Sequence, residues 1–354
     1  MEKKENESER YCMEYVWIDG DGGLRSKIRI TNTNEFKKLV WNFDGSSTNQ
    51  ATTGDSEVEL IPVQSYSNPL MMKIDGLEDM QSYFLLCKCK YRDGREDNYD
   101  KAIKIMNQKS VMKERPWFGL EQEYFLVDKS THLPVGFGKD VNGMIVKIEP
   151  VKQQGKYYCG IGASNIIGRK IAERHMMVCI KMGIQISGIN AEVAYGQWEY
   201  QVGPVEGIEA ANQLWISRYI LHRIAEEEGY DITFEPKPIT WGSWNGSGCH
   251  TNFSTKGMRE KNGIQVIMSA MEKLKIKHKE HIEVYGSDNH LRLTGKHETS
   301  SMEEFTYGIG SRNTSIRIGY QTESDGKGYF EDRRPSSNMD PYLVCSKICE
   351  TILT

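Results

Sequence analysis

The chain has 354 residues, of which 38% are hydrophobic and 27% charged, and this composition predicts a globular protein of roughly two domains. Its 45 Lys and Arg against 49 Asp and Glu leave a net charge of −4, which argues against a surface built for nucleic acid or anionic lipid. No apolar run approaches the roughly 20 residues of a membrane span. The N-terminus is rich in Glu and lacks an apolar signal region, and the 8 Cys have no regular spacing. We therefore expect a cytoplasmic protein with reduced thiols.

The N-terminal part of the chain has the alternating or continuous apolar pattern of β-strands. The segments are Tyr11–Ile18, Leu24–Ile30, Glu57–Val63 and Tyr83–Tyr91, separated by clusters of Gly and Asp. This pattern predicts a small β domain that ends at about residue 97.

Beyond residue 97 the pattern alternates between helices and strands. Helices are expected from Tyr99 to before Pro116 and over Ser164–Met182, Ile208–Glu228, Gly263–His281 and Pro341–Ile352, and strands over Phe118–Leu126, Ile184–Val193 and Gln197–Val202. Ser164 and Asn165 are suited to cap a helix N-terminus, and Gly183 and Gly229 stand where left-handed C-caps are needed. Residues 136–155 are expected to form a loop or hairpin.

Several motif-like features have simpler interpretations. Neither a P-loop nor a strand-linked G-x-G-x-x-G is present. Cys87 and Cys89 share one face of a predicted strand, and without a second Cys pair we interpret them as packing residues. His278 and His281 lie one turn apart on a Lys-rich helix, and we expect a solvated helix face there in preference to a metal site.

Carboxylates on predicted strands are the most informative residues. Glu121 and Glu123 point to the same face because strand side chains alternate, and two like charges in an apolar run call for a cation. Two further acids, Glu192 and Glu199, follow on later segments. His250 and Glu331 complete the candidates. Oxygen ligands with a single His suit Mg²⁺ or Mn²⁺ better than structural zinc.

The second half of the chain places arginines in short contexts rich in Gly and Ser: Arg292, Arg312, Arg317, Arg333 and Arg334. Arginine binds carboxylate and phosphate groups in bidentate fashion. Acids for a divalent metal together with arginines for anions indicate phosphoryl transfer.

From Tyr15 to Thr351 the sequence resembles eukaryotic-type (type II) glutamine synthetase. The motifs that carry the resemblance are Trp41–Thr48, Pro116–Tyr124, Tyr157–Gly162, Gly196–Pro204, Trp244–Thr255, Arg292–Thr299 and Gly328–Tyr342. The resemblance implies an α+β fold. A small N-terminal β-grasp-like domain (1–97) would precede a larger catalytic α/β domain (98–354) with a curved, mainly antiparallel sheet.

The resemblance also assigns ligands. Two or three Mg²⁺ or Mn²⁺ ions per site would be held by two sets of residues, Glu123, Glu192 and Glu199 in one and Glu121, His250 and Glu331 in the other. It assigns ATP contacts to Trp117, Glu121, Glu199, Asn252, Ser254, Arg312, Arg317 and the backbone around Tyr329 and Phe330. It assigns glutamate contacts to Trp244, Asn245, Gly246, His250, Arg292, Arg312 and Arg333.

The activity implied is ATP-dependent ligation of ammonia to the γ-carboxylate of L-glutamate through γ-glutamyl phosphate. Asp44, Glu298, Arg312 and Arg333 would have the catalytic roles, Asp44 as the group that deprotonates ammonium. The implied assembly is a homo-oligomeric ring of two stacked pentamers, a decamer, in which Asp44 completes the active site of a neighbouring subunit. Neither nucleic acid nor membrane is an expected partner.

Two segments depart from the family pattern, Phe137–Lys156 and Gly310–Thr314, so we expect an altered loop in the first and an altered placement of Arg312 in the second. Three other functions are compatible with parts of the pattern: a γ-glutamyl-amine ligase on the same scaffold, a non-catalytic structural or regulatory relative, and a phosphagen-type kinase. Asp44 and Glu298 favour ammonia as the acceptor. The six retained metal-ligand candidates favour an enzyme.

Overall fold

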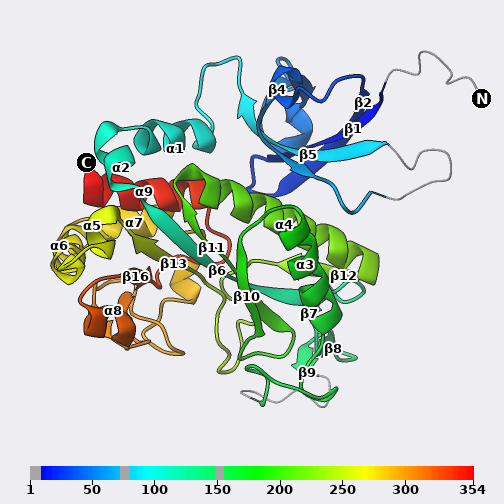
Figure 1. The fold of residues 1–354 in the computed structure, drawn as a ribbon. Helices are drawn as coiled ribbons and strands as arrows, with labels where there is room; N and C mark the ends of the chain where they lie inside the picture. The colour runs from blue at the N-terminus through cyan, green and yellow to red at the C-terminus, as the bar shows by residue number, and fades with distance from the viewer. Residues whose placement is uncertain (1–8, 72–79, 148–154) are drawn as a thin grey trace, which may run out of the picture. The chain divides into compact units, whose positions relative to one another are not determined.

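The computed structural model describes residues 9–71, 80–147 and 155–354. By its internal contacts the chain divides into two compact units, one of residues 1–101 with 180–183 and the other of residues 102–179 with 184–354. We call them the N-terminal unit and the catalytic unit. The division falls a few residues beyond the expected boundary at residue 97. Figure 1 shows the helices and strands of the chain, coloured by residue number.

The N-terminal unit contains a five-stranded sheet with the order β2-β1-β5-β4-β3. Its strands are β1 Tyr11–Ile18, β2 Leu24–Thr31, β3 Trp41–Asp44, β4 Glu57–Ser67 and β5 Gln81–Lys90, and the short 3₁₀ helices η1 Phe36–Lys38 and η2 Gly45–Thr48 flank β3. Strand β1 pairs in parallel with β5 and antiparallel with β2, in the β-grasp-like arrangement that was expected. Cys87 and Cys89 are buried in the core of this sheet, so the interpretation as packing residues is confirmed.

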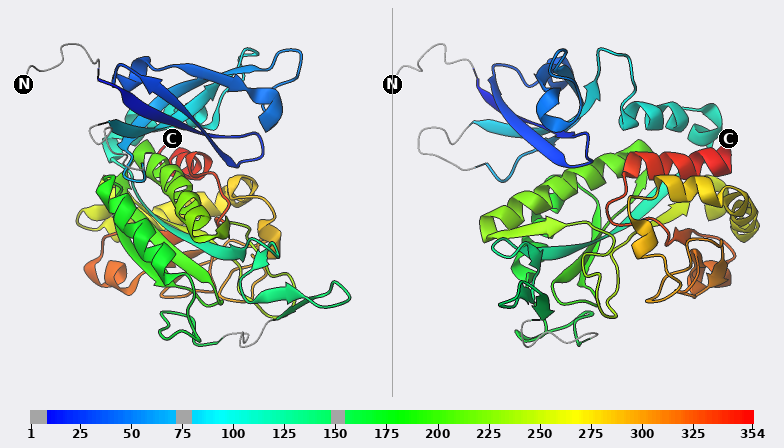
Figure 2. Two further views of the ribbon diagram at one scale, coloured as in Figure 1. Left: turned by 90° about the vertical axis from the view of Figure 1, so that its right-hand side faces the viewer. Right: turned by 180° about the vertical axis from the view of Figure 1, so that it is seen from behind.

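The catalytic unit is organised around a curved sheet of nine described strands (Figure 2). The order is β10-β11-β6-β13-β16-β15-β14, with β7 and β12 also paired to β6. These strands are β6 Trp117–Asp128, β7 Leu133–Pro134, β10 Ile186–Ala191, β11 Gln197–Glu206, β12 Tyr230–Thr233, β13 Cys249–Ser254, β14 Tyr307–Ile309, β15 Ile316–Ile318 and β16 Phe330–Asp332. All pairs except β14 with β15 are antiparallel, as expected of this fold class.

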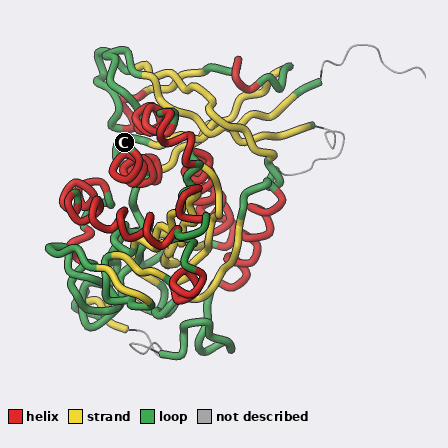
Figure 3. Tube along the Cα trace, turned by 60° about the vertical axis from the view of Figure 1, so that its left-hand side comes forward, coloured by secondary structure: helices red, strands yellow, loops and turns green. Residues whose placement is uncertain are grey.

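Helices cover one side of this sheet. The helices of the chain are α1 Asn98–Met106, α2 Lys109–Glu114, α3 Arg169–Lys181, α4 Ile208–Glu228, α5 Lys256–Arg259, α6 Gly263–Ile276, α7 His278–Val284, α8 Tyr320–Asp325 and α9 Pro341–Leu353. Helix α4 packs on β11 and on α9. Trp198, Tyr200 and Val202 of β11 are buried, which confirms that one face of this strand is apolar. Figure 3 shows that loops connect many of the helices and strands.

Three helix predictions needed correction. The helix expected before Pro116 is broken at Asn107 and Gln108 into α1 and α2, and the helix over 263–281 is broken at Lys277 into α6 and α7. Helix α3 begins at Arg169, so Ser164 and Asn165 do not cap it. Gly168 has φ +85°, and a Cβ on it would lie 2.1 Å from Leu126, so the chain turns sharply there before the helix starts.

The interpretation of His278 and His281 as a solvated helix face was wrong, because both side chains are buried. His278 accepts a hydrogen bond from Arg334 at 2.9 Å and contacts the carbonyl of Met302. His281 contacts the hydroxyls of Tyr285 and Thr351 at 2.6 and 2.8 Å. They belong to an internal polar network.

The remaining helix expectations are confirmed. Helix α4 matches its predicted bounds, Gly229 closes it in the left-handed conformation, and Gly183 has φ +85°. Of the loop or hairpin expected within 136–155, the structure has a hairpin of β8 Phe137–Lys139 and β9 Ile145–Lys147, and residues 148–154 of that segment lie outside the described residues. Among the described residues, no helix is long and apolar enough to cross a membrane.

Candidate active site

The acids on β6 are placed opposite further candidate ligands by the register of the sheet. Glu123 lies directly across from Glu199 on β11, and Glu121 lies directly across from His250 on β13. Side chains directly opposite each other in antiparallel strands project from the same face. Backbone pairing therefore brings together residues that are 76 and 129 positions apart in the sequence.

We call the first group the His250 trio: Glu121, His250 and Glu331. The Nδ1 atom of His250 lies 3.3 Å from a carboxylate oxygen of Glu121 and 3.4 Å from one of Glu331. The other Glu121 oxygen accepts a hydrogen bond of 2.7 Å from Asn252. Strand β16 supplies Glu331.

The second group, which we call the Glu192 trio, consists of Glu123, Glu192 and Glu199. Glu123 accepts a hydrogen bond of 2.7 Å from the backbone N–H of Gly248. Glu192 stands just after β10, where the side chain of Asn190 and the N–H of Val193 hold its carboxylate at 3.0 and 3.1 Å. In each trio the ligand atoms lie within 4.8 Å of one another.

Four arginines face these acids. Arg333 forms a 2.5 Å ion pair with Glu331, and Arg317 contacts the other oxygen of the same carboxylate at 3.1 Å. Arg292 is buried and donates to Nε2 of His250 at 3.1 Å. Arg312 is half-exposed and forms a 3.1 Å ion pair with Glu298.

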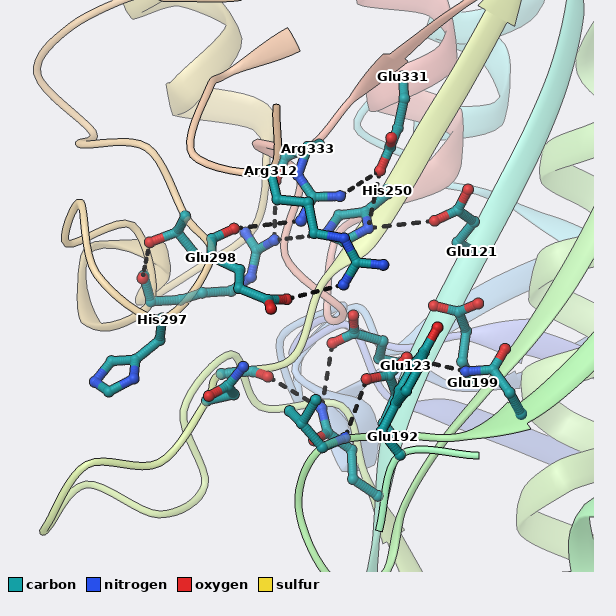
Figure 4. Close-up of a pocket in the computed structure, with 18 of the residues that line it drawn as sticks. Glu121, Glu123, Glu192, Glu199, His250, His297, Glu298, Arg312, Glu331 and Arg333 are labelled. Carbon is teal, nitrogen blue, oxygen red and sulfur yellow. Dashed lines mark hydrogen bonds and ion pairs between the residues drawn. The ribbon is translucent and has the colours of Figure 1, made fainter. Parts of the chain in front are cut away.

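Both trios and all four arginines line one cavity of about 230 Å³. Figure 4 shows the trios one above the other, with Arg312, Arg333 and Glu298 facing them. The backbone carbonyl of Glu298 also accepts a hydrogen bond from Arg333 at 3.2 Å. The cavity is thus divided between a wall of carboxylates and a wall of guanidinium groups.

Burial strongly perturbs the acids in this cavity. Desolvation, followed by the charge of Glu192, raises the pKa of Glu123 to about 8. Desolvation and neighbouring carboxylates likewise raise the pKa of Glu199 to about 8 and that of Glu192 to about 7. Desolvation and the charge of Arg333 hold the pKa of His250 well below its usual range. The nearby positive charge therefore does not fully offset the desolvation of these carboxylates and their mutual repulsion.

The donor set fits divalent cations. Five carboxylates and one imidazole form two clusters of closely spaced ligand atoms, and hard cations such as Mg²⁺ and Mn²⁺ take oxygen ligands of this kind. A bound cation would also neutralise acids that burial otherwise favours in the protonated form.

A second cavity of about 430 Å³ adjoins the first, since Glu121 and Gln201 line both. Its wall includes five residues predicted to contact nucleotide: Trp117, Glu121, Asn252, Ser254 and Tyr329. Phe118, Val202, Pro204 and Phe253 give it an apolar lining. A flat aromatic base could be buried here with its polar substituents directed toward the first cavity.

Some predicted contacts lie elsewhere. The side chain of Trp244 is buried against Phe137, and only its neighbours Asn245 and Gly246 line the first cavity. The ring of Phe330 packs against Phe253 in the core, and the nucleotide contact predicted for this residue involves only its backbone. Asp44 belongs to the N-terminal unit, where its carboxylate caps η2 by accepting from the N–H and hydroxyl of Ser46 at 3.0 and 2.7 Å.

The structure adds residues that the sequence analysis did not single out. Gln197 donates to Glu123 at 3.3 Å and to the carbonyl of Gly246 at 3.0 Å. It stands two positions before Glu199, so strand alternation could have identified it. Arg259, which lies over the ring of Trp117 at 4.0 Å, lines the second cavity, and only the fold brings these two residues together.

A sheet that presents two acid-rich trios, each able to hold a metal ion, beneath arginines is typical of an enzyme that transfers phosphoryl groups. The family model of the glutamine synthetase catalytic domain matches residues 93–277. The cytosolic isozyme 1-1 of glutamine synthetase from Oryza sativa subsp. japonica is 47% identical over 353 residues, which cover 98% of this chain and 95% of that protein. The cytosolic isozyme from Pinus sylvestris is 46% identical over 355 residues, covering 98% and 94%.

A solved structure supports the fold. The cryo-EM structure of Plasmodium falciparum glutamine synthetase matches with a TM-score of 0.77 at 18% identity, covering 99% of this chain and 73% of that one. The chain belongs to the glutamine synthetase family, as the resemblance to the eukaryotic type indicated.

Proposed function

We propose that this chain ligates ammonia to the γ-carboxylate of L-glutamate at the expense of ATP, giving L-glutamine, ADP and phosphate. The observation that carries the proposal is the single cavity in which both carboxylate trios face Arg312 and Arg333, in a chain of the glutamine synthetase family. The reaction must bring together two anions, and this cavity offers positive charge to both.

The two trios would hold Mg²⁺ or Mn²⁺, two or three ions per site. When bound, such ions would offset the negative charge that develops on the phosphate oxygens during the transfer. His250 and Glu331 would hold one ion beside Arg333, and Glu123 and Glu199 would hold another.

The glutamate substrate would lie against Asn245, Gly246 and Arg292 at the wall of the first cavity. ATP would bury its base between Trp117 and Tyr329 in the second cavity, with its phosphates directed past Glu121. In the first step a γ-carboxylate oxygen of glutamate attacks the terminal phosphorus of ATP, and ADP leaves. Arg312, Arg317 and Arg333 stabilise the equatorial charge, because preorganised guanidinium groups need no reorganisation during the transfer.

In the second step ammonia attacks the acyl carbon of γ-glutamyl phosphate and phosphate leaves. Ammonium becomes a nucleophile only after it loses a proton, and we assign that proton to Asp44 of a neighbouring subunit. Glu298, held over the cavity by Arg312, would complete the ammonium site and exclude water. Water would otherwise hydrolyse the acyl phosphate.

The shared use of Asp44 requires an assembly, and we propose the ring of two stacked pentamers that the sequence analysis predicted. A cytoplasmic location is supported by relatives that are named cytosolic isozymes.

The test is a stoichiometric assay with purified protein, L-glutamate, ammonium, ATP and Mg²⁺. Glutamine and phosphate should appear in equal amounts and only when all four components are present. Replacing ammonium with methylamine or ethanolamine at equal concentration distinguishes a γ-glutamyl-amine ligase, which would prefer the amine. Release of phosphate without glutamine or a γ-glutamyl amide would refute the proposal.

A further inference from the structure

Arg218 of α4 is a buried arginine on the side of β6 opposite to the metal trios. Only 2% of it is exposed, and its guanidinium lies over the rings of Trp215 and Phe234. Its Nε, Nη1 and Nη2 donate to the side chain of Gln122 and to the carbonyls of Met339 and Ser337, at 2.8, 2.8 and 2.9 Å. All three acceptors are neutral oxygens, an unusual environment for a buried cation.

Gln122 connects this guanidinium to the acids. It lies between Glu121 and Glu123 on β6, so its side chain points away from the cavity that its two neighbours face. Its amide nitrogen donates to the carbonyls of Glu123 and Ser337, at 2.8 and 3.0 Å. Strand β6 is therefore held by hydrogen bonds to Gln122 on the face opposite to the cavity, at the position between Glu121 and Glu123.

Ser337 connects Arg218 and Gln122 to the segment around Gly248 and to strand β16. Its carbonyl accepts from both Arg218 and Gln122, and its N–H donates to the carbonyl of Ser247 at 3.1 Å. Ser247 precedes Gly248, whose N–H holds the carboxylate of Glu123. Ser337 also follows closely after β16, which carries Glu331.

We infer that Arg218 is a positioning residue for the metal centre, one that fixes the spacing of the two trios through Gln122 and Ser337. The inference rests on the proposed function only in taking the trios as metal sites. The planar fork of arginine donates in three directions at once, whereas a lysine ammonium on a flexible stem cannot reproduce that geometry. Groups that orient metal ligands from behind typically change metal affinity by about 10- to 100-fold when they are removed.

The experiment titrates Mn²⁺ alone into the full-length assembled protein and measures the number of sites and their dissociation constants. Arg218→Met removes both fork and charge, Arg218→Lys keeps the charge, and Gln122→Met cuts the link to β6 while leaving the arginine. Each variant should weaken at least one Mn²⁺ site by about tenfold or more. If Arg218→Met does not fold, the other two variants still test the inference.

Two controls separate positioning from a general loss of stability. Arg223→Met removes a half-buried arginine from the same helix, and Leu274→Ala creates a cavity in α6; both should leave Mn²⁺ binding unchanged in the folded protein. Unchanged Mn²⁺ affinity in the folded Arg218 and Gln122 variants would overturn the inference, as would full recovery in Arg218→Lys. A wild-type chain that makes no glutamine would refute the proposed function, while the Mn²⁺ titration would still report on Arg218.

Discussion

Glu123 combines burial with a high density of like charge. It lies on β6 across from Glu199, and its pKa of about 8 reflects desolvation first and the charge of Glu192 second. Without a bound cation the neutral form is favoured at pH 7. An amide of the same shape would remove the free-energy cost of burying a charge among other carboxylates. It would, however, be a weaker metal ligand than the carboxylate.

Glu123→Gln should therefore abolish glutamine synthesis without unfolding the protein. We expect kcat to fall by at least about 100-fold, because removing charge stabilisation at a transferring group typically costs this much. The metal-free variant should melt at the same temperature as the wild type or higher at pH 8. Calorimetry and the glutamine assay measure both effects, with Glu272→Gln on the exposed side of α6 as the control. Retained activity would show that Glu123 does not bind an essential metal.

The candidate ligands could be selected from the sequence because strand alternation and residue type are local properties. Glu121 and Glu123 were assigned to one face before their partners were known, and the structure brings all six candidates into one cavity. The burial of His278 and His281 could not be predicted, since the partners of His278 are Arg334 and Met302 and a partner of His281 is Thr351, which are brought there only by the fold.

At the scale of elements, α4 shows how a helix end can be fixed by one residue. Its C-cap Gly229 has φ +80°, and its N–H reaches the carbonyls of Ala225 and Glu226. Any residue with a Cβ is disfavoured in this left-handed conformation. Because α4 carries Arg218 and packs on β11, its end matters for the support of the site.

Gly229→Ala should lower the free energy of unfolding by about 1–2 kcal/mol through backbone strain alone. A Cβ there would meet only Lys129 at 3.4 Å, an ordinary contact. The matched control is Gly319→Ala, since Gly319 has φ −68° and open space around it, and that change should be neutral or slightly stabilising. Urea denaturation compares the two. Equal effects would mean that the left-handed cap contributes nothing.

Long elements with strong periodicity were predictable, and short ones were not. Helix α4 and strand β1 match their expected bounds, since a clear pattern extends over their whole length. Strands β14, β15 and β16 have three residues each, too few for a period to emerge, and they form because the sheet edge beside β13 supplies their partners. The break at Lys277 likewise has no local signal in Gly or Pro.

For the whole molecule, a buried histidine makes the free energy of unfolding decrease at acid pH. His175 is buried, contacts the carbonyl of Ser217 at 3.0 Å and has its pKa lowered by desolvation to about 4. The unfolded chain takes up this proton near pH 6.5, whereas the folded chain does so only near pH 4. Protonation of His175 therefore has no effect on the free energy of unfolding above about pH 7, and it lowers that free energy as the pH falls from 6.5 toward 4.

Between pH 7.5 and pH 5 this single group should destabilise the wild type by about 2 kcal/mol. His175→Gln removes the titration, so its stability should fall less over the same interval, whatever its stability at pH 7.5. Urea titrations at several pH values give the slope of the free energy of unfolding against pH for each protein. The difference between the two slopes is due to His175, because the carboxylates titrate in both proteins. Parallel slopes would show that His175 titrates normally in the folded state.

The proposed ring implies that each active site is completed by residues from two chains. Asp44→Asn and Glu123→Gln should each be inactive as pure assemblies, because each removes a different part of every site. When the two are mixed 1:1, dissociated and reassembled, about a quarter of the sites would pair an intact Asp44 with an intact Glu123 from different chains, so that activity reappears. Mixing without dissociation is the control and should restore nothing. If one chain supplied both residues to its own site, every site would lack one of them in any mixture, and the reassembled protein would stay inactive.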